Sequence, residues 1–269
     1  MTWRMLDLFS GIGGFSLAAQ WCWGDDLEIV AFCEIDKFCQ KVLKKHWPNV
    51  PLIEDVRDAK DFDSINLLTA GAPCQPFSKV GPRKGKQDNR YLWREMFSVI
   101  SETKSDWLVF ENVPEIDGMV LDEWIIDLET QNYEVAPPFK IPACAVNSPQ
   151  ERYRLWLVAY SKSIRYEHGK GSFKERTNGQ PCIGGSLLCD STSERLPDWT
   201  GGKMEQPKTI TEFERPSGRE IECNFRGMAY GISRRVDRLK SLGNAIVPQI
   251  AFQIFRTIKE IGNGKMPCL

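Results

Sequence analysis

The first 160 residues alternate short apolar runs with amphipathic stretches, and this rhythm restricts the fold more than any other feature. The runs have the length of buried strands and cover residues 5–9, 29–34, 66–71, 107–111 and 155–160. Between them, apolar side chains recur at helical spacing: Leu92, Met96, Val99 and Ile100, then Leu121, Trp124, Ile125 and Leu128. This alternation predicts an α/β fold, with a mainly parallel sheet and helices on both faces.

The rhythm stops near residue 161 and returns at the end of the chain. Residues 161–225 are rich in Ser, Gly, Pro, Thr and charge, and Trp199 and Phe213 favour a small folded module there over a disordered insertion. After Pro248, apolar spacing predicts a helix that packs on the N-terminal sheet through Ala251, Ile254, Phe255 and Ile258. We expect a main domain of residues 1–160 plus 234–262, an inserted domain of residues 161–233 and a tail of residues 263–269.

Length and cysteine content favour a soluble cytoplasmic protein. The chain has 269 residues, and no apolar run is long enough to cross a bilayer. The N-terminal segment reads as a buried strand and not as a secretion signal. The nine cysteines contain no CxxC pair, which is typical of free thiols in a reducing compartment. We expect no metal site, because the spacing of His168, Cys182, Cys189 and Cys223 matches no zinc pattern.

Positive charge is concentrated locally although the formal net charge is −1. Residues 79–94 and residues 215–240 both carry a marked excess of Lys and Arg over acids. Attraction of phosphate depends on the local potential, so these segments are compatible with a nucleic-acid partner. A solvated charged surface would have the same composition, and charge alone does not decide between the two.

The segment DLFSGIGGFSLA predicts a strand, a glycine turn and the start of a helix. Gly11, Gly13 and Gly14 would allow the backbone to approach a ligand closely. Glu34 ends the next strand, where a carboxylate can bind ribose hydroxyls. Because the pattern is not GxGxxG, it favours a nucleotide-like cofactor over a dinucleotide, although a glycine turn without a ligand remains open.

The segment GAPCQPFSKVGPRKGKQDNR places Cys74 directly after a predicted strand. Open α/β folds bind ligands at this carboxyl edge of the sheet. Pro73 and Pro76 stiffen the backbone around the thiol, and the polar stretch that follows suits a loop that closes over a substrate. A lone cysteine is more often a small buried apolar residue, but this setting favours a nucleophile.

Three further segments bring polar groups to the same edge. In FENV, Glu111 ends an apolar strand, where partial desolvation would raise its pKa and let it donate a proton. In SPQERYRL, Arg152 and Arg154 lie two apart, so both point to one face of an extended segment. LGNAIVPQIA forms a turn into the final helix.

These five segments, in this order, resemble the signature motifs of the cytosine-5 DNA methyltransferases. The resemblance covers most of residues 1–160 and 234–260, and PCQPFS, ENV, QERYR and GNAIVP together are highly specific. It implies a Rossmann-like, S-adenosylmethionine-dependent methyltransferase fold with a small, loop-rich target-recognition domain. In that family the recognition region lies between the QxRxR and GNA segments, which is the inserted domain here.

The resemblance also implies a role for each motif residue. Cys74 would attack carbon 6 of cytosine, Glu111 would act at N3, Arg154 would hold the O2 side, and Arg152 would lie close to the reacting centre. S-adenosylmethionine, released as S-adenosylhomocysteine, would be held by Asp7, Phe9, Gly11, Gly13, Gly14, Glu34, Asp55, Val56, Pro73, Asn244 and Ala245. DNA would meet the loop and its neighbours through Gln75, Ser78, Lys79, Arg83, Lys84, Arg90 and Gln150.

The predicted activity is methylation of carbon 5 of a cytosine flipped out of a specific duplex DNA sequence, through a covalent bond from Cys74 to carbon 6. The alternatives are a tRNA cytosine-5 methyltransferase, which typically carries a Cys-Phe-Thr segment absent here, and a non-catalytic DNA-binding relative, which would have lost Cys74 or Glu111. An NAD(P) oxidoreductase would leave PCQPFS and GNAIVP unexplained. We expect a monomer with double-stranded DNA as partner and no membrane contact; whether a companion restriction endonuclease exists is undecided.

Overall fold

A computed structural model of the chain describes residues 2–72, 92–116, 118, 120–146, 148, 151–163 and 235–262. These residues all belong to one unit, which comprises residues 1–168 and 231–269. The boundary predicted between main and inserted domains falls at the edge of the described ranges, so it stays a prediction. In the described part of the chain, no helix combines the length and the apolar character that a membrane crossing requires.

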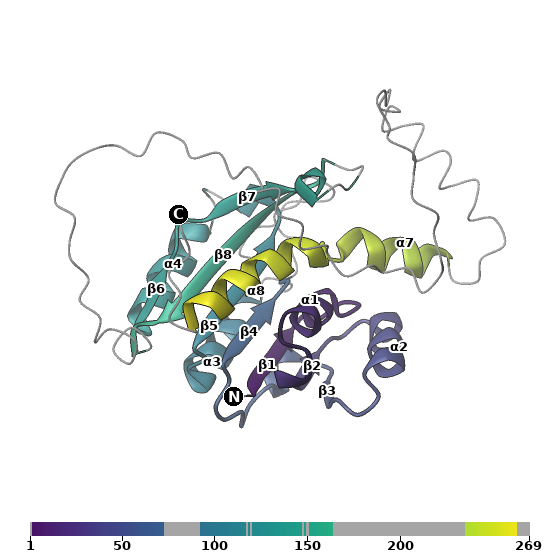
Figure 1. The fold of residues 1–269 in the computed structure, drawn as a ribbon, viewed down its shortest axis with the longest axis horizontal. Helices are drawn as coiled ribbons and strands as arrows, with labels where there is room; N and C mark the ends of the chain where they lie inside the picture. The colour runs from purple at the N-terminus through teal and green to yellow at the C-terminus, as the bar shows by residue number, and fades with distance from the viewer. Residues whose placement is uncertain are drawn as a thin grey trace. The chain divides into compact units, whose positions relative to one another are not determined.

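Within the described residues, eight strands form one sheet in the order β3-β2-β1-β4-β5-β8-β6, with β7 paired to β8 (Figure 1). The parallel strands are β1 Trp3–Leu8, β2 Leu27–Cys33, β3 Leu52–Ile53, β4 Leu67–Ala70 and β5 Trp107–Asn112. The antiparallel strands are β6 Tyr133–Val135, β7 Phe139–Pro142 and β8 Tyr153–Ser161. The five predicted strands and the mainly parallel sheet are confirmed.

Apolar side chains on both sides of each central strand bury both faces of the sheet. On β1, Leu6 and Leu8 belong to one apolar cluster, while Met5 points into the other. Leu68 and Leu67 of β4 divide in the same way. Because successive side chains of a strand point to opposite faces, a continuous apolar run fits a strand that is covered on both sides.

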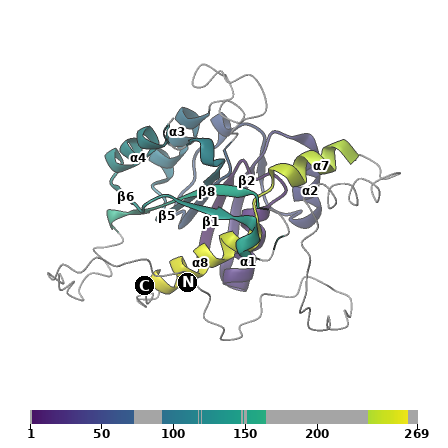
Figure 2. The same ribbon diagram turned by 90° about the horizontal axis from the view of Figure 1, so that it is seen from above.

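The helices form a layer on each face of the sheet (Figure 2). The first layer holds α3 Trp93–Thr103 and α4 Leu121–Thr130, which bury the predicted residues Met96, Val99, Ile100, Leu121, Trp124 and Leu128. The second holds α1 Gly14–Trp23 and α8 Pro248–Gly262, which packs Ala251, Phe255 and Ile258 against the sheet as predicted. The elements nearest the cavity described below are α2 Lys37–His46, the short 3-10 turn η2 Val56–Asp58, and α7 Arg235–Asn244.

Candidate active site

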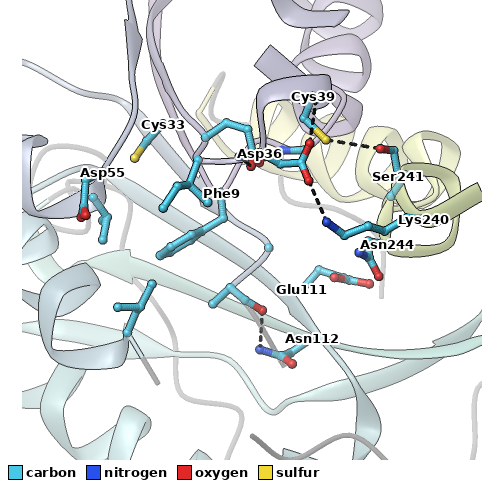
Figure 3. A pocket seen from close by; sticks show the side chains of 18 of the residues that line it. Phe9, Cys33, Asp36, Cys39, Asp55, Glu111, Asn112, Lys240, Ser241 and Asn244 are labelled. Atoms are coloured by element: carbon cyan, nitrogen blue, oxygen red, sulfur yellow. Dashed lines mark hydrogen bonds and ion pairs between the residues drawn. The ribbon is translucent and has the colours of Figure 1, made fainter. Parts of the chain in front are cut away.

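A cavity of about 460 Å³ opens where the strand order reverses, between β1 and β4 (Figure 3). Open α/β sheets bind ligands at such a switch point, outside the carboxyl ends of the strands. Its walls come from the carboxyl ends of the five parallel strands, from β8 and from the C-terminal segment. Of the predicted residues, those that line it are Phe9, Gly11, Glu34, Asp55, Val56, Glu111, Arg154, Asn244 and Ala245.

The three motif glycines have different neighbours. Gly11 has φ +56 and lines the cavity, and a Cβ placed on it would meet no atom within 4 Å. A Cβ on Gly13, whose φ is +86, would lie 2.6 Å from the Trp47 ring. A Cβ on Gly14 would lie 2.6 Å from Cγ1 of Ile246. Only Gly11 therefore presents open backbone to a ligand, while the other two allow close packing of protein against protein.

The Glu34 carboxylate ties the glycine turn to the start of α2. Its Oε2 accepts a hydrogen bond from the Gly11 backbone N at 2.7 Å, and its Oε1 accepts one from the Asp36 backbone N at 2.7 Å. Burial raises the pKa of Glu34, and these backbone donors oppose that change. Each carboxylate oxygen has a second lone pair, so the group can accept from a ligand hydroxyl while it holds the turn.

Asp7 lies beneath the cavity and does not line it. Its Oδ2 accepts from the Ser16 hydroxyl and its Oδ1 from the Thr69 hydroxyl, each at 2.8 Å. Burial raises the pKa of this carboxyl to about 7, against the effect of both hydroxyls. Asp7 thus joins β1, α1 and β4 at the point from which β4 leads to the cysteine segment.

Asp55 enters the cavity from the turn after β3. Its Oδ1 accepts from the Arg57 backbone N at 3.0 Å, and its Oδ2 pairs with Nη1 of the same residue at 3.0 Å. The Arg57 Nη2 also lies 3.5 Å from Oε1 of Glu95 on α3. The carboxylate is therefore held in one orientation beside Val56, which also lines the cavity.

Glu111 and Arg154 form an ion pair at the rim of the cavity, with Arg154 Nε 2.9 Å from Glu111 Oε1. Burial raises the pKa of Glu111 to about 7, although Arg154 and the nearby Arg152 both act to lower it. A Cβ built on Gly71 would lie 4.0 Å from Glu111 Oε2, and Asn112 Nδ2 donates to the Ala72 carbonyl at 3.4 Å. The pair is therefore next to the backbone that leads into the cysteine segment.

Helix α7 closes one wall of the cavity against the start of α2 (Figure 3). Lys240 Nζ donates to Asp36 Oδ2 at 2.8 Å, and Cys39 Sγ lies 3.5 Å from the Ser241 hydroxyl. Sequence reasoning did not assign a role to these four residues. A lysine or serine in an amphipathic stretch carries no signal of a partner some 200 positions away, so only the tertiary structure could find them.

Of the remaining predicted site residues, some lie within the described part of the chain and others lie outside it. Gly13, Gly14 and Arg152 lie near the cavity but are not among its lining residues. The following lie outside the described residues: Pro73, Cys74, Gln75, Ser78, Lys79, Arg83, Lys84, Arg90 and Gln150. Their roles stay predictions. Ile35, which lines the cavity and is 71% exposed, was not predicted; an apolar residue directly after the Glu34 carboxylate was the available signal.

Comparison with known proteins agrees with this geometry. Residues 3–215 match the family of C-5 cytosine-specific DNA methylases. The chain belongs to this family. The chain is 34% identical over 165 residues to the type II methyltransferase M2.BsuMI of Bacillus subtilis, and the match covers 58% of this chain and 41% of that protein. It is 34% identical over 177 residues to the type II methyltransferase M.AluI of Cellulosimicrobium cellulans, and this match covers 58% of this chain and 33% of that protein.

The match therefore spans less than half the length of these two relatives. Among solved structures, a prophage-encoded E. coli protein described as a DNA modification methyltransferase has a TM-score of 0.51 and 25% identity. It covers 61% of this chain and 48% of its own. The Dnmt2 methyltransferase of S. pombe has a TM-score of 0.50 at 22% identity, covering 64% of this chain and 57% of its own, and this shows likeness of fold alone. The predicted Rossmann-like methyltransferase fold of this chain is confirmed.

Proposed function

We propose that this chain transfers a methyl group from S-adenosylmethionine to carbon 5 of a cytosine in a specific duplex DNA sequence. The observation that carries the proposal is the buried Glu111–Arg154 pair, which stands at the rim of a cofactor-sized cavity and beside the backbone leading to Cys74. Membership of the cytosine-5 family supports the reaction type. Type II methyltransferases among the relatives support duplex DNA as the substrate.

The residues of the cavity fit the cofactor. The open backbone at Gly11 and the apolar side chains Phe9, Ile35 and Val56 suit a nucleoside, and the volume is typical of small-ligand sites. Glu34 would accept from the ribose hydroxyls and Asp55 from the amino group of adenine, with Asn244 and Ala245 on the remaining wall. When bound, the cofactor supplies an electrophilic methyl group on a sulfonium.

The chain's own side chains would activate the cytosine ring. The Cys74 thiolate adds to carbon 6, and the electron pair displaced from the ring reaches N3, which takes a proton from Glu111. A carboxyl with a pKa of about 7 is divided between its two forms near neutral pH, as a proton donor of this kind requires. Carbon 5 then accepts the methyl group. Loss of the carbon 5 proton to water expels the Cys74 thiolate, N3 returns its proton to Glu111, and the aromatic ring is restored. Arg154 would hold the O2 side throughout.

The reaction requires the target base to leave the helical stack, because neither face of carbon 6 is accessible within a duplex. We propose that the basic loop from Lys79 to Arg94, whose last two residues belong to the start of α3, closes behind the flipped base and that residues 161–233 read neighbouring bases. A companion endonuclease, as the type II relatives suggest, is part of this proposal.

Trapping of the covalent intermediate tests the nucleophile and the substrate together. Duplex DNA with 5-fluorocytosine at the methylated position should hold the wild-type protein covalently when the cofactor is present, because fluorine cannot leave as the proton does. Cys74→Ser should give no adduct but still bind DNA. The target sequence comes from bisulfite sequencing of DNA from expressing cells.

An adduct on another cysteine would refute the assignment of Cys74. Methyl transfer to tRNA and not to duplex DNA would favour the tRNA methyltransferase instead. A chain that binds DNA but methylates neither substrate would be a non-catalytic relative.

A further inference from the structure

Polar contacts hold the described part of the segment that carries Asn244 and Ala245 over the cavity. Among the side chains of α7 that the structure describes, Ser241 is buried, whereas Asp237, Arg238, Lys240 and Leu242 are exposed. Apolar burial secures most helices of a domain, and none of these five side chains provides buried apolar surface. Their polar contacts therefore bear on whether the C-terminal end of α7 remains on the cavity wall.

Two such contacts join α7 to the start of α2. Lys240 Nζ lies 2.8 Å from Asp36 Oδ2, and the Ser241 hydroxyl lies 3.5 Å from Cys39 Sγ (Figure 3). The pair is charged on both sides near neutral pH, because each partner shifts the other's pKa in the direction that favours its ion: downward for Asp36 and upward for Lys240. These contacts anchor the C-terminal half of α7 on the cavity side.

A third contact anchors the chain on the other side of Asn244. Ile246 packs so closely on Gly14 that a Cβ there would lie 2.6 Å from Ile246 Cγ1. Asn244 and Ala245 therefore lie between two attachment points, one on α2 and one on α1. If the first were released, the described contacts that still hold this wall would lie on the α8 side, where Ile246 and Val247 pack against the core, and the end of α7 would lose its attachment to α2.

Resting on the proposed function, we infer that Lys240 is a positioning residue for the cofactor. Its ion pair with Asp36 docks α7, so that Asn244 and Ala245 complete the wall against which the cofactor binds. Lys240 lines the cavity itself, and its effect on the cofactor runs through the ion pair with Asp36, which holds its Nζ. It sets the affinity for the cofactor and leaves the chemical step unchanged.

The test measures, by calorimetry, the binding of S-adenosylhomocysteine, an overall neutral ligand, to the full-length protein. Lys240→Met removes the charge and keeps the length of the side chain. Asp36→Asn removes the charge while retaining a residue type that caps helices well, because Asp36 also accepts from the backbone N of Phe38 and Cys39. Arg238→Met is the matched control: it removes one positive charge from an exposed side chain of the same helix.

We expect Lys240→Met and Asp36→Asn each to raise the dissociation constant about three- to fivefold, which is the scale of a partly exposed ion pair. The double variant should be no weaker than Lys240→Met alone, because both changes break one interaction. Lys240→Arg and Arg238→Met should bind like the wild type. Added salt should weaken binding to the wild type more than to Lys240→Met, and KM for S-adenosylmethionine should rise at constant kcat.

Other outcomes would overturn the inference. A loss in Lys240→Met without a loss in Asp36→Asn would mean that Lys240 contacts the ligand itself. An equal loss in Arg238→Met would mean that general charge, and not docking, is responsible. Unchanged affinity in Lys240→Met would exclude any role, while the proposed function would stand. A wild-type protein that binds no S-adenosylhomocysteine would refute the proposed function, and this inference with it.

Discussion

Glu111 is subject to burial and to neighbouring cations, which act on its carboxyl in opposite directions. Burial is the larger influence, so its pKa rises to about 7 although Arg154 Nε lies 2.9 Å from Oε1. A fully solvated glutamate would be ionised at neutral pH and would donate no proton, while a buried one without the arginines would rarely ionise. The two influences together give a carboxyl suited to exchange of a proton with N3.

Replacement of Glu111 by Gln should lower methyl transfer by about 10²- to 10⁴-fold, the usual contribution of a general acid or base. Duplex DNA and S-adenosylhomocysteine should still bind, because the amide has nearly the same shape. Rates and binding constants measured side by side check this, with Glu129→Gln, an exposed position on α4, as the matched control. A variant with full activity would remove Glu111 from the mechanism.

The same carboxyl should leave a pH signature in stability. An acid whose pKa is raised by folding stabilises the folded state below its unfolded pKa, near 4.5 for Glu111, and this contribution is lost as the pH rises through the folded value near 7. Glu111→Gln should therefore gain stability relative to the wild type as the pH rises from about 4.5 to about 7, by roughly 1.4 kcal/mol for each pH unit.

Urea unfolding of both proteins at several pH values measures that difference. Asp7, whose pKa is also raised to about 7, follows the same trend in both proteins and cancels. A pH-independent difference would contradict the raised pKa of Glu111.

Between elements, the glycine turn before α1 and the segment before α8 form one packed joint. Gly14 is the first residue of α1, and Ile246 occupies the space that a side chain at this position would need. Helix α8 then packs beside α1 on the same face of the sheet. The requirement for glycine at this position therefore comes from the last part of the chain and not from a ligand. The joint also fixes one end of the cavity wall.

Substitution of Gly14 by Ala should destabilise the protein by about 1–3 kcal/mol, as overpacking in a rigid contact does. The double variant Gly14→Ala with Ile246→Ala should be less destabilised than the sum of the two single variants, because the second change makes room for the new methyl group. Gly243→Ala, where a Cβ would meet no atom within 4 Å, is the control. Additive losses in urea unfolding would contradict this account.

In the whole molecule, the described unit contains the eight-stranded sheet and a helix layer on each face, with the cavity at the switch point. The described polar contacts that hold this cavity, from Glu34 to Lys240, lie within that unit. The sheet has its apolar faces covered by these two layers. Under the proposed function, we therefore expect the choice of DNA sequence to vary with the inserted region while the chemistry stays constant.

Exchange of residues 161–226 for the equivalent region of another family member should change the methylated sequence and retain methylation at carbon 5. Base contacts carry about 1–3 kcal/mol of discrimination each, whereas phosphate contacts weaken binding to all sequences alike. Bisulfite sequencing of DNA from cells expressing the chimaera measures the outcome. An active chimaera that methylates the original sequence would assign recognition to the basic loop from Lys79 to Arg94.

Local patterns in the sequence were sufficient for five of the described strands, for the apolar faces of α3, α4 and α8, and for much of the cavity lining. A strand that is buried on both faces appears in the sequence as a continuous apolar run. The covered face of a helix appears as apolar residues that recur every three to four positions. The carboxyl ends of parallel strands share one edge, so Glu34 and Glu111, each at the end of a predicted strand, could be assigned to that edge, and both line the cavity. Their positions follow from the direction of the strands alone.

Tertiary structure alone decided the contacts between distant segments. The short strands β3, β6 and β7 have too few residues for a periodic signal, and the antiparallel direction of β8 depends on where the chain returns. The sequence motif groups three glycines, but only packing against Trp47 and Ile246 distinguishes Gly13 and Gly14 from Gly11, which lines the cavity. Lys240 and Asp36 are 204 positions apart, and their ion pair forms only after the sheet and its helices have assembled.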